Sequence, residues 1–147
     1  MARIQLEGTA DAPAAVVFGY VDDWTNTTKY MQGLTKWEPA GEVTHGLGAT
    51  FDAAMQVGPT SIDSVLEITT WEQDRALGWE PRKGIKQSGT WRFQPAGDRT
   101  LVTIVLDVTF PGGIAGRLLG KTTEPILRSQ VQKSLAALTE QVERLPR

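Results

Sequence analysis

Ser88–Phe110 reads SGTWRFQPAGDRTLVTIVLDVTF, and this stretch decides the fold. Apolar and polar residues alternate on both sides of a Pro-Ala-Gly-Asp turn at residues 95–98. A period of two is typical of strands with one buried face, and the turn predicts that the strands form a hairpin. The residues expected on the apolar face are Trp91, Phe93, Val102, Ile104, Leu106 and Val108. The opposite face would carry Thr103, Asp107 and Thr109, so the sheet has one apolar and one wet side.

The chain before this hairpin predicts more strands and two short helices. Arg3–Ala10 alternates as a strand. A helix is expected to follow, with Asp11 as its cap and Pro13 in its first turn. A second short helix or irregular turn is expected within residues 22–34. From Leu34 onward, strand candidates follow one another without the length of a crossover helix between them. This order predicts an antiparallel meander.

The C-terminal segment predicts the element that covers the apolar side of the sheet. Its apolar residues recur at steps of three and four, as on one face of a helix. They are Leu127, Val131, Leu135, Leu138, Val142 and Leu145. A helix of about 20 residues is about 30 Å long, which matches a strand of about nine residues.

Composition excludes several classes of protein. The chain has 147 residues, a formal net charge of -2 and no cysteine. Scattered Lys and Arg argue against a nucleic-acid partner, and the absence of cysteine excludes disulfides and thiolate metal sites. No apolar run reaches the length of a signal peptide or membrane span, so we expect no transmembrane segment and a cytoplasmic location. One domain over residues 1–147 is the expectation from length.

Ala115–Thr122 approaches the phosphate-loop pattern G-x-x-x-x-G-K-[ST]. Ala115 replaces the first glycine, and the preceding strand belongs to a hairpin rather than a parallel sheet. Only Thr123–Arg147 remains downstream, which leaves no room for the strands that would supply a magnesium ligand. The segment is therefore interpreted as a short apolar lid or a helix-entry turn rich in glycine.

Several segments together carry a resemblance to a known family. They are ADAPAAVVFGYV at residues 10–21, the Gly78-Trp79 pair, the hairpin, PGGIAGRLLG at 111–120 and SLAALTEQVE at 134–143. The chain resembles the START-like (SRPBCC) superfamily, in particular its polyketide cyclase/dehydrase and lipid-transport branch. The resemblance implies an α+β helix-grip fold: a curved antiparallel sheet of about seven strands wraps a long C-terminal helix, with two short helices after the first strand. It also implies a cavity between sheet and helix for a lipid, polyketide, sterol or other apolar molecule. By the same resemblance, residues 111–124 would be the glycine-bearing approach to the long helix, and Pro125 would start or kink its main part.

Aromatic and methionine side chains are the main candidates for lining that cavity, although five tryptophans also suit ordinary core packing. The predicted ligand-binding residues are Tyr20, Tyr30, Met31, Met55, Trp79, Trp91, Leu118, Leu119, Ile126, Leu127 and Gln130. Gln130 would supply one orienting hydrogen bond. Trp71 is a further candidate, but it is out of phase with its neighbouring strand residues.

Catalytic groups are not identified by any motif. His45, the single histidine, has Gly46 and Gly48 as neighbours, which favours a surface turn. Glu67 and Asp107 fall on the wet face of the sheet, and no ligand set for a metal or other cofactor is recognised.

The preferred hypothesis is a protein that binds, and carries or sequesters, a small hydrophobic ligand without catalysis. A cyclase or dehydrase that uses cavity Tyr and Arg side chains is the alternative, and a partner-binding adaptor stays open. The oligomeric state is left undetermined.

Overall fold

The computed structural model describes the backbone of residues 2–109 and 113–146, and the side chains of residues 3–59, 61–109 and 124–146. Its elements in chain order are β1 (Ala2–Ala10), α1 (Ala14–Asp22), the 3-10 helix η1 (Trp24–Asn26), α2 (Thr27–Tyr30), β2 (Leu34–Pro39), β3 (Thr50–Val57), β4 (Thr60–Glu72), β5 (Ala76–Gly84), β6 (Lys86–Ala96), β7 (Arg99–Thr109) and α3 (Gly113–Glu143). The predicted order of one strand, two short helices, a meander and a long helix is confirmed.

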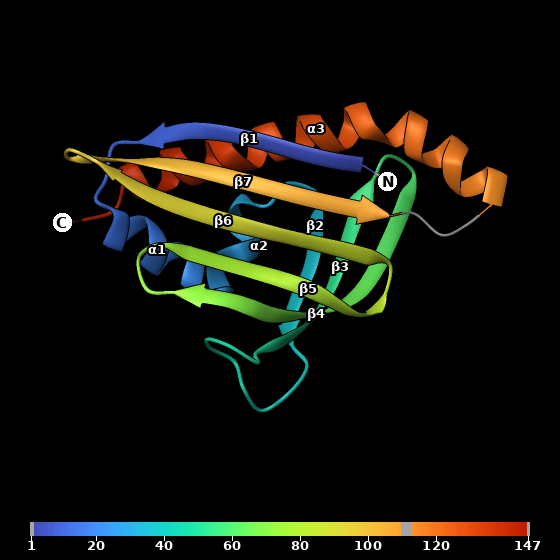
Figure 1. Ribbon diagram of the computed structural model, residues 1–147, viewed down its shortest axis with the longest axis horizontal. Coiled ribbons are helices and arrows are strands. Elements are labelled where there is room, and N and C mark those ends of the chain that lie inside the picture. The colour runs from blue at the N-terminus through green and yellow to red at the C-terminus, as the bar shows by residue number, and fades with distance from the viewer. Residues whose placement is uncertain (1, 110–112, 147) are drawn as a thin grey trace.

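The seven strands form one antiparallel sheet in the order β1-β7-β6-β5-β4-β3-β2. The first strand therefore lies beside the last, and every other neighbour is also a neighbour in sequence. Figure 1 shows β2 and β3 crossing behind the other strands, so the sheet curls. Register shifts between Val65 and Leu66 and between Ile68 and Thr70 mark irregularities in the β4–β5 pairing. Such bulges bend a strand and increase its twist.

The hairpin of β6 and β7 has the two faces that its sequence predicts. Trp91 pairs with Ile104, and Phe93 pairs with Val102. These four side chains are at most 2 % exposed, whereas Asp107 lies on the other face of β7. The alternation of apolar and polar residues thus reflects a real division between core and solvent.

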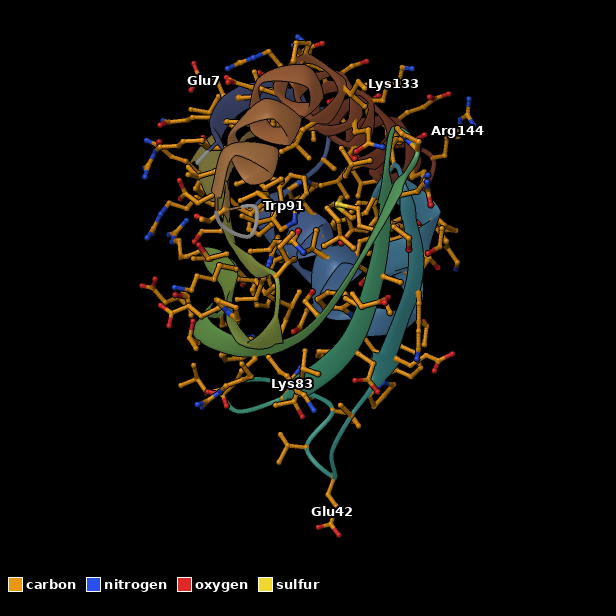
Figure 2. All side chains as sticks on the ribbon, turned by 90° about the vertical axis from the view of Figure 1, so that its right-hand side faces the viewer. Glu7, Glu42, Lys83, Trp91, Lys133 and Arg144 are labelled. Carbon is orange, nitrogen blue, oxygen red and sulfur yellow. The ribbon has the colours of Figure 1, made fainter. Side chains whose placement is uncertain are left out.

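Helix α3 covers the open side of the curled sheet and packs most closely against β1. In Figure 2 the sheet curves around the sides and bottom of the view, and α3 lies across its open top. The predicted apolar face is buried at Leu127, Val131, Leu135, Leu138 and Val142, while Leu145 follows the end of the helix and is half-buried. The helix continues through Pro125 back to Gly113, so Pro125 lies inside the helix.

One local prediction about α1 is wrong. The N-cap position is Pro13, and no side chain caps the first turn. Asp11 lies two residues earlier, where its backbone N–H donates to Glu143 Oε1 at 3.0 Å. The start of α1 is thereby tied to the end of α3 rather than closed by a local Asp cap.

Candidate functional site

A cavity lies between the concave face of the sheet and the α1–α2 segment. Its walls come from α1, η1 and α2, from β2 to β6, and from residues 40–49, which join β2 to β3 and are called here the mouth loop. The space open to the centre of a water molecule is narrow, at ≈ 40 Å³. Thr44 and His45 are the exposed lining residues of the mouth loop, so the cavity opens there.

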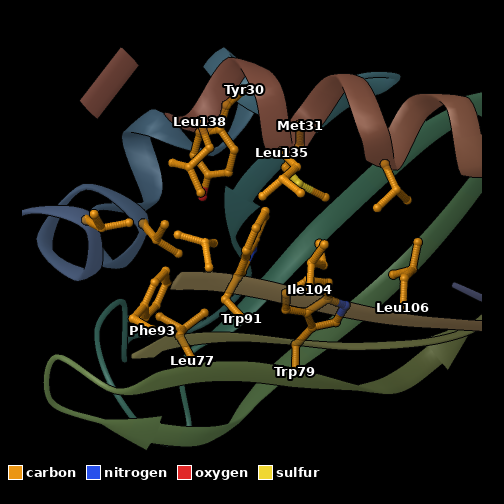
Figure 3. Packing of buried hydrophobic residues seen from close by; sticks show 14 of the residues in the cluster. Tyr30, Met31, Leu77, Trp79, Trp91, Phe93, Ile104, Leu106, Leu135 and Leu138 are labelled. Carbon is orange, nitrogen blue, oxygen red and sulfur yellow. The ribbon is translucent and has the colours of Figure 1, made fainter. Parts of the chain in front are cut away.

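The wall is built largely from aromatic rings. Trp37 stacks on Phe51 with ring centroids 4.8 Å apart and planes 14° from parallel. Trp37 also meets Trp79 edge to face at 6.4 Å, and Tyr30 meets Trp91 in the same way at 6.1 Å. Figure 3 shows Tyr30 and Met31 approaching Trp91 from the helix side. Flat faces of this kind favour contact with an apolar or ring-containing molecule.

Gly89 determines where the Trp79 ring lies. Trp79 on β5 pairs with Gly89 on β6, and its ring lies against the position that a Cβ would occupy there. Such a Cβ would stand 2.8 Å from Cη2 and 2.9 Å from Cε2 of the ring. Trp79 Nε1 is buried and has no hydrogen-bond partner among the described residues. A buried N–H without a partner is costly, so this atom stands out in an apolar wall.

Tyr30 lines the cavity with its phenol in the neutral form. Its side chain is 1 % exposed, and burial raises the pKa of its phenol well above the ordinary value, although a hydrogen bond from Thr27 opposes that shift. The phenol therefore keeps its proton at neutral pH and acts as a hydrogen-bonding group rather than as a base.

A polar cluster holds the mouth loop to the end of α1. His45 Nε2 lies 2.5 Å from Asp22 Oδ2, and Trp71 Nε1 donates to Asp22 Oδ1 at 2.9 Å. The rings of His45 and Trp71 meet edge to face at 5.6 Å. Gly46 and Gly48 have positive φ angles, so the surface turn expected from these glycines is present. His45 is nevertheless at the rim of the cavity.

The structure brings together part of the set of residues predicted to bind ligand. Those that line the cavity are Tyr30, Met31, Met55, Trp79 and Trp91. Each of them is less than 8 % exposed. They come from α2 and its C-terminal end, β3, β5 and β6, which the curl of the sheet brings around one space.

The other predicted residues lie elsewhere. The Tyr20 hydroxyl donates to Gln141 Oε1 at 2.6 Å, which directs it toward α3. Leu127 is fully buried beside a second, smaller void, and Ile126 is 39 % exposed.

The predicted hydrogen-bonding residue on α3 also faces away from the cavity. Gln130 Nε2 donates to the Gln56 carbonyl at 2.6 Å, so its amide joins α3 to β3. The side chains of Leu118 and Leu119 lie outside the described residues.

Several lining residues were absent from the sequence-based set, among them Trp24, Trp37, Asp22 and Gln87. Gln87 had a usable signal, because it is in phase with Trp91 and Phe93 on the apolar face of β6. Trp71, the uncertain candidate, is not a lining residue. Of the five tryptophans, the other four line the cavity.

The charged groups of the cavity are confined to its rim. Among the described lining residues, Asp22 is the only carboxylate and there is no Lys or Arg. Arg92 points to the opposite side of β6, where it is exposed and lies 3.9 Å from Glu72. The described residues also contain no group of three or more His, Cys, Asp or Glu side chains able to hold a metal ion.

Comparison with models of known protein families identifies the family of this chain. The family model for polyketide cyclase / dehydrase and lipid transport matches residues 1–143. The chain belongs to this family. Comparison with curated protein sequences finds no match. Family and fold together fit a protein of the hydrophobic ligand-binding or polyketide cyclase/dehydrase kind.

Solved structures show the same helix-grip fold. Protein TTHA0849 from Thermus thermophilus has a TM-score of 0.82 at 21% identity, with 95% of this chain and 96% of that chain covered. The Zhui aromatase/cyclase from Streptomyces sp. R1128 has a TM-score of 0.75 at 19% identity, with 97% and 93% covered. A START superfamily protein from Mycobacterium smegmatis has a TM-score of 0.70 at 16% identity, with 97% and 99% covered. Within the part of the chain described, no helix is long and apolar enough to cross a membrane.

Proposed function

We propose that this protein binds a small, largely apolar, ring-containing molecule in the cavity and carries or sequesters it. The observation that carries the proposal is the composition of the wall. Trp24, Trp37, Trp79 and Trp91 line the cavity together with Tyr30, while its charged groups stay at the rim. A ligand held there would be recognised mainly by shape and by burial of its apolar surface.

Binding of a ring-containing ligand requires side chains of the cavity wall to move. The cavity volume of ≈ 40 Å³ is too small for a ring-containing ligand with the side chains as they stand. Met31 and Met55 line the cavity, and methionine adapts its shape readily because its side chain is unbranched. The proposal therefore includes displacement of these two side chains when ligand enters.

A blocking variant tests the proposal. Ala49 is fully buried and lines the cavity, so Ala49→Leu should fill part of it. Ala54→Leu adds the same atoms on the half-exposed outer face of β3, outside the cavity, and is the matched control. Calorimetric titration with naphthyl methyl ketone should show saturable binding to wild type and Ala54→Leu, with affinity at least about tenfold lower for Ala49→Leu. Equal affinity for the blocked and control variants would refute a ligand site in this cavity.

A second candidate is catalysis of ring closure or dehydration, and one observation favours it. His45 and Asp22 form a close pair at the cavity rim, an arrangement suited to general acid–base chemistry. This differs from the sequence-based alternative, because no described Arg lines the cavity. A linear aliphatic triketone is a suitable probe, since its cyclisation changes its ultraviolet absorbance. Faster cyclisation by wild type than by His45→Ala would support an enzyme, and equal rates would leave the carrier function alone.

A further inference from the structure

We infer that the indole N–H of Trp79 and the side-chain amide of Gln87 together bind one oxygen of the ligand inside the cavity. They thereby select an uncharged ligand that has a carbonyl oxygen. This inference rests on the proposed function and names the chemical class of the ligand. It concerns two polar groups on an otherwise largely apolar wall, the indole N–H of Trp79 and the side-chain amide of Gln87.

Trp79 supplies a donor without a partner in the described part of the chain. The residue is 6 % exposed, lines the cavity, and its Nε1 makes no hydrogen bond to a described residue. In Figure 3 the nitrogen lies on the side of the ring toward Leu106, which is the β7 partner of Gly89. The indole nitrogen can only donate, so its natural partner is an acceptor brought in by a ligand.

Gln87 supplies a second polar group on the same wall. It is 5 % exposed on the inner face of β6. It lines both the cavity and the smaller void next to it. Its amide carries both a donor and an acceptor, so it places a polar group in a wall that is otherwise largely apolar.

The backbone brings these two groups to one end of the cavity. The Trp79 ring crosses from β5 to Gly89, and Gln87 lies two residues from Gly89 on the same face of β6. Two residues along a strand span about 7 Å. Cε2, the ring carbon bonded to Nε1, is among the atoms nearest to the Gly89 position. A single ligand oxygen at this end can therefore approach both the indole N–H and the Gln87 amide.

The charges around the cavity determine which type of ligand oxygen it can accept. No described Lys or Arg lines the cavity, and Asp22 stands at its rim. A carboxylate would lose its hydration without gaining a cation, which is strongly unfavourable. A pure hydrocarbon would leave both protein groups unpaired. A neutral carbonyl oxygen avoids both costs, because it accepts hydrogen bonds without bringing charge.

Three naphthalene probes of similar size test the inference. They are naphthyl methyl ketone, ethylnaphthalene and naphthoate, and their dissociation constants for the purified protein are compared by titration calorimetry. Two new hydrogen bonds predict that the ketone binds about tenfold more tightly than the hydrocarbon. The naphthoate should bind about 100-fold more weakly than the ketone.

Two variants connect this preference to the named residues. Gln87→Leu and Trp79→Phe should each reduce the preference for ketone over hydrocarbon to about threefold or less. Gln94→Leu changes an exposed glutamine on the outer face of β6 and should keep the wild-type preference. Should either variant fail to fold, the indole proton of Trp79 in wild type gives a second readout. Its resonance should move downfield with the ketone and not with the hydrocarbon.

The outcomes separate the inference from the proposed function. If all three probes bind and the ketone has no advantage, the cavity binds ligand but the carbonyl pair does not exist. A ketone preference that survives in both variants would also overturn the assignment. If none of the probes binds saturably, both the proposed function and the carbonyl pair are refuted.

Discussion

The Trp79 ring lies so close to Gly89 in the adjacent strand that it leaves no room for a Cβ there. A methyl group at Gly89 would stand 2.8 Å from Cη2 of the ring. Gly89→Ala must therefore displace a rigid, buried indole that forms part of the cavity wall. We expect a loss of about 1–3 kcal/mol in the free energy of unfolding, measured by urea denaturation, and weaker binding of naphthyl methyl ketone.

Gly19→Ala is the matched control for this change. Gly19 lies in the exposed part of α1, and a Cβ there meets nothing within 4 Å. Alanine is favoured over glycine inside a helix, so this variant should gain about 0.5–1 kcal/mol. If Gly89→Ala were as stable as Gly19→Ala, the close packing of Trp79 on β6 would be disproved.

Tyr30 predicts a specific dependence of stability on alkaline pH. Burial raises the pKa of its phenol, so above pH of about 10 the unfolded chain loses this proton while the folded chain keeps it. The free energy of unfolding should then fall with rising pH, by up to about 1.4 kcal/mol per pH unit from this group. Below pH 10, about its ordinary pKa, the contribution is constant.

Tyr30→Phe isolates that contribution. The variant cannot ionise at this position, so its stability should fall less steeply than that of wild type above pH 10, about where free tyrosine titrates. Denaturant unfolding at a series of alkaline pH values measures both slopes. Parallel curves would show that the Tyr30 hydroxyl is not buried in the folded protein.

Leu127 should behave as a core residue and not as a ligand contact. It is fully buried on α3 beside the smaller void and does not line the main cavity. Leu127→Ala should cost about 2–5 kcal/mol in unfolding free energy while the folded variant binds naphthyl methyl ketone with nearly unchanged affinity. Leu47→Ala, at a side chain that is 62% exposed, should change stability by less than about 0.5 kcal/mol. A large loss of affinity with little loss of stability in Leu127→Ala would place this residue in the ligand site.

His45 should restrain the mouth loop with little effect on global stability. Its side chain is 63% exposed, so the pair with Asp22 contributes less than about 1 kcal/mol. His45→Ala should speed hydrogen exchange of the Gly48 amide, which donates to the Ile68 carbonyl at 3.0 Å, by about two- to fivefold. Glu42→Ala, at the tip of the loop in Figure 2, should leave that rate unchanged. The same exchange rate in all three proteins would mean that His45 does not hold the loop.

The sheet and its covering helix were predictable from sequence because each has a one-dimensional pattern. Alternation in β7 separates Ile104 from Asp107, and the steps from Leu127 to Leu138 mark one face of α3. These patterns follow from local geometry, with periods of 2.0 and about 3.6 residues. The burial of each face then follows from the hydrophobic effect.

The cavity was less predictable because it depends on curvature and on distant segments. Trp37 meets Phe51 on the adjacent strand β3, but it meets Trp79 on β5 only because the sheet curls. Tyr20 and Tyr30 look equivalent on the early helices, yet one hydroxyl is engaged by Gln141 and the other residue lines the cavity. The sequence contains no local feature that distinguishes such neighbours. The Gln87 phase on β6 is the exception, since a polar residue on an apolar face is visible in the pattern itself.

The most direct test of the proposed cavity uses the indole N–H resonances during titration with naphthyl methyl ketone. Trp24, Trp37, Trp79 and Trp91 line the cavity, whereas Trp71 donates to Asp22 outside the wall. Proton–nitrogen correlation spectra, assigned with single Trp→Phe variants, follow all five signals at once. We predict that the four lining indoles shift saturably with one dissociation constant, Trp79 most strongly and Trp71 least. A saturable change centred on Trp71, or no saturable change in the four lining indoles, would contradict ligand binding in this cavity.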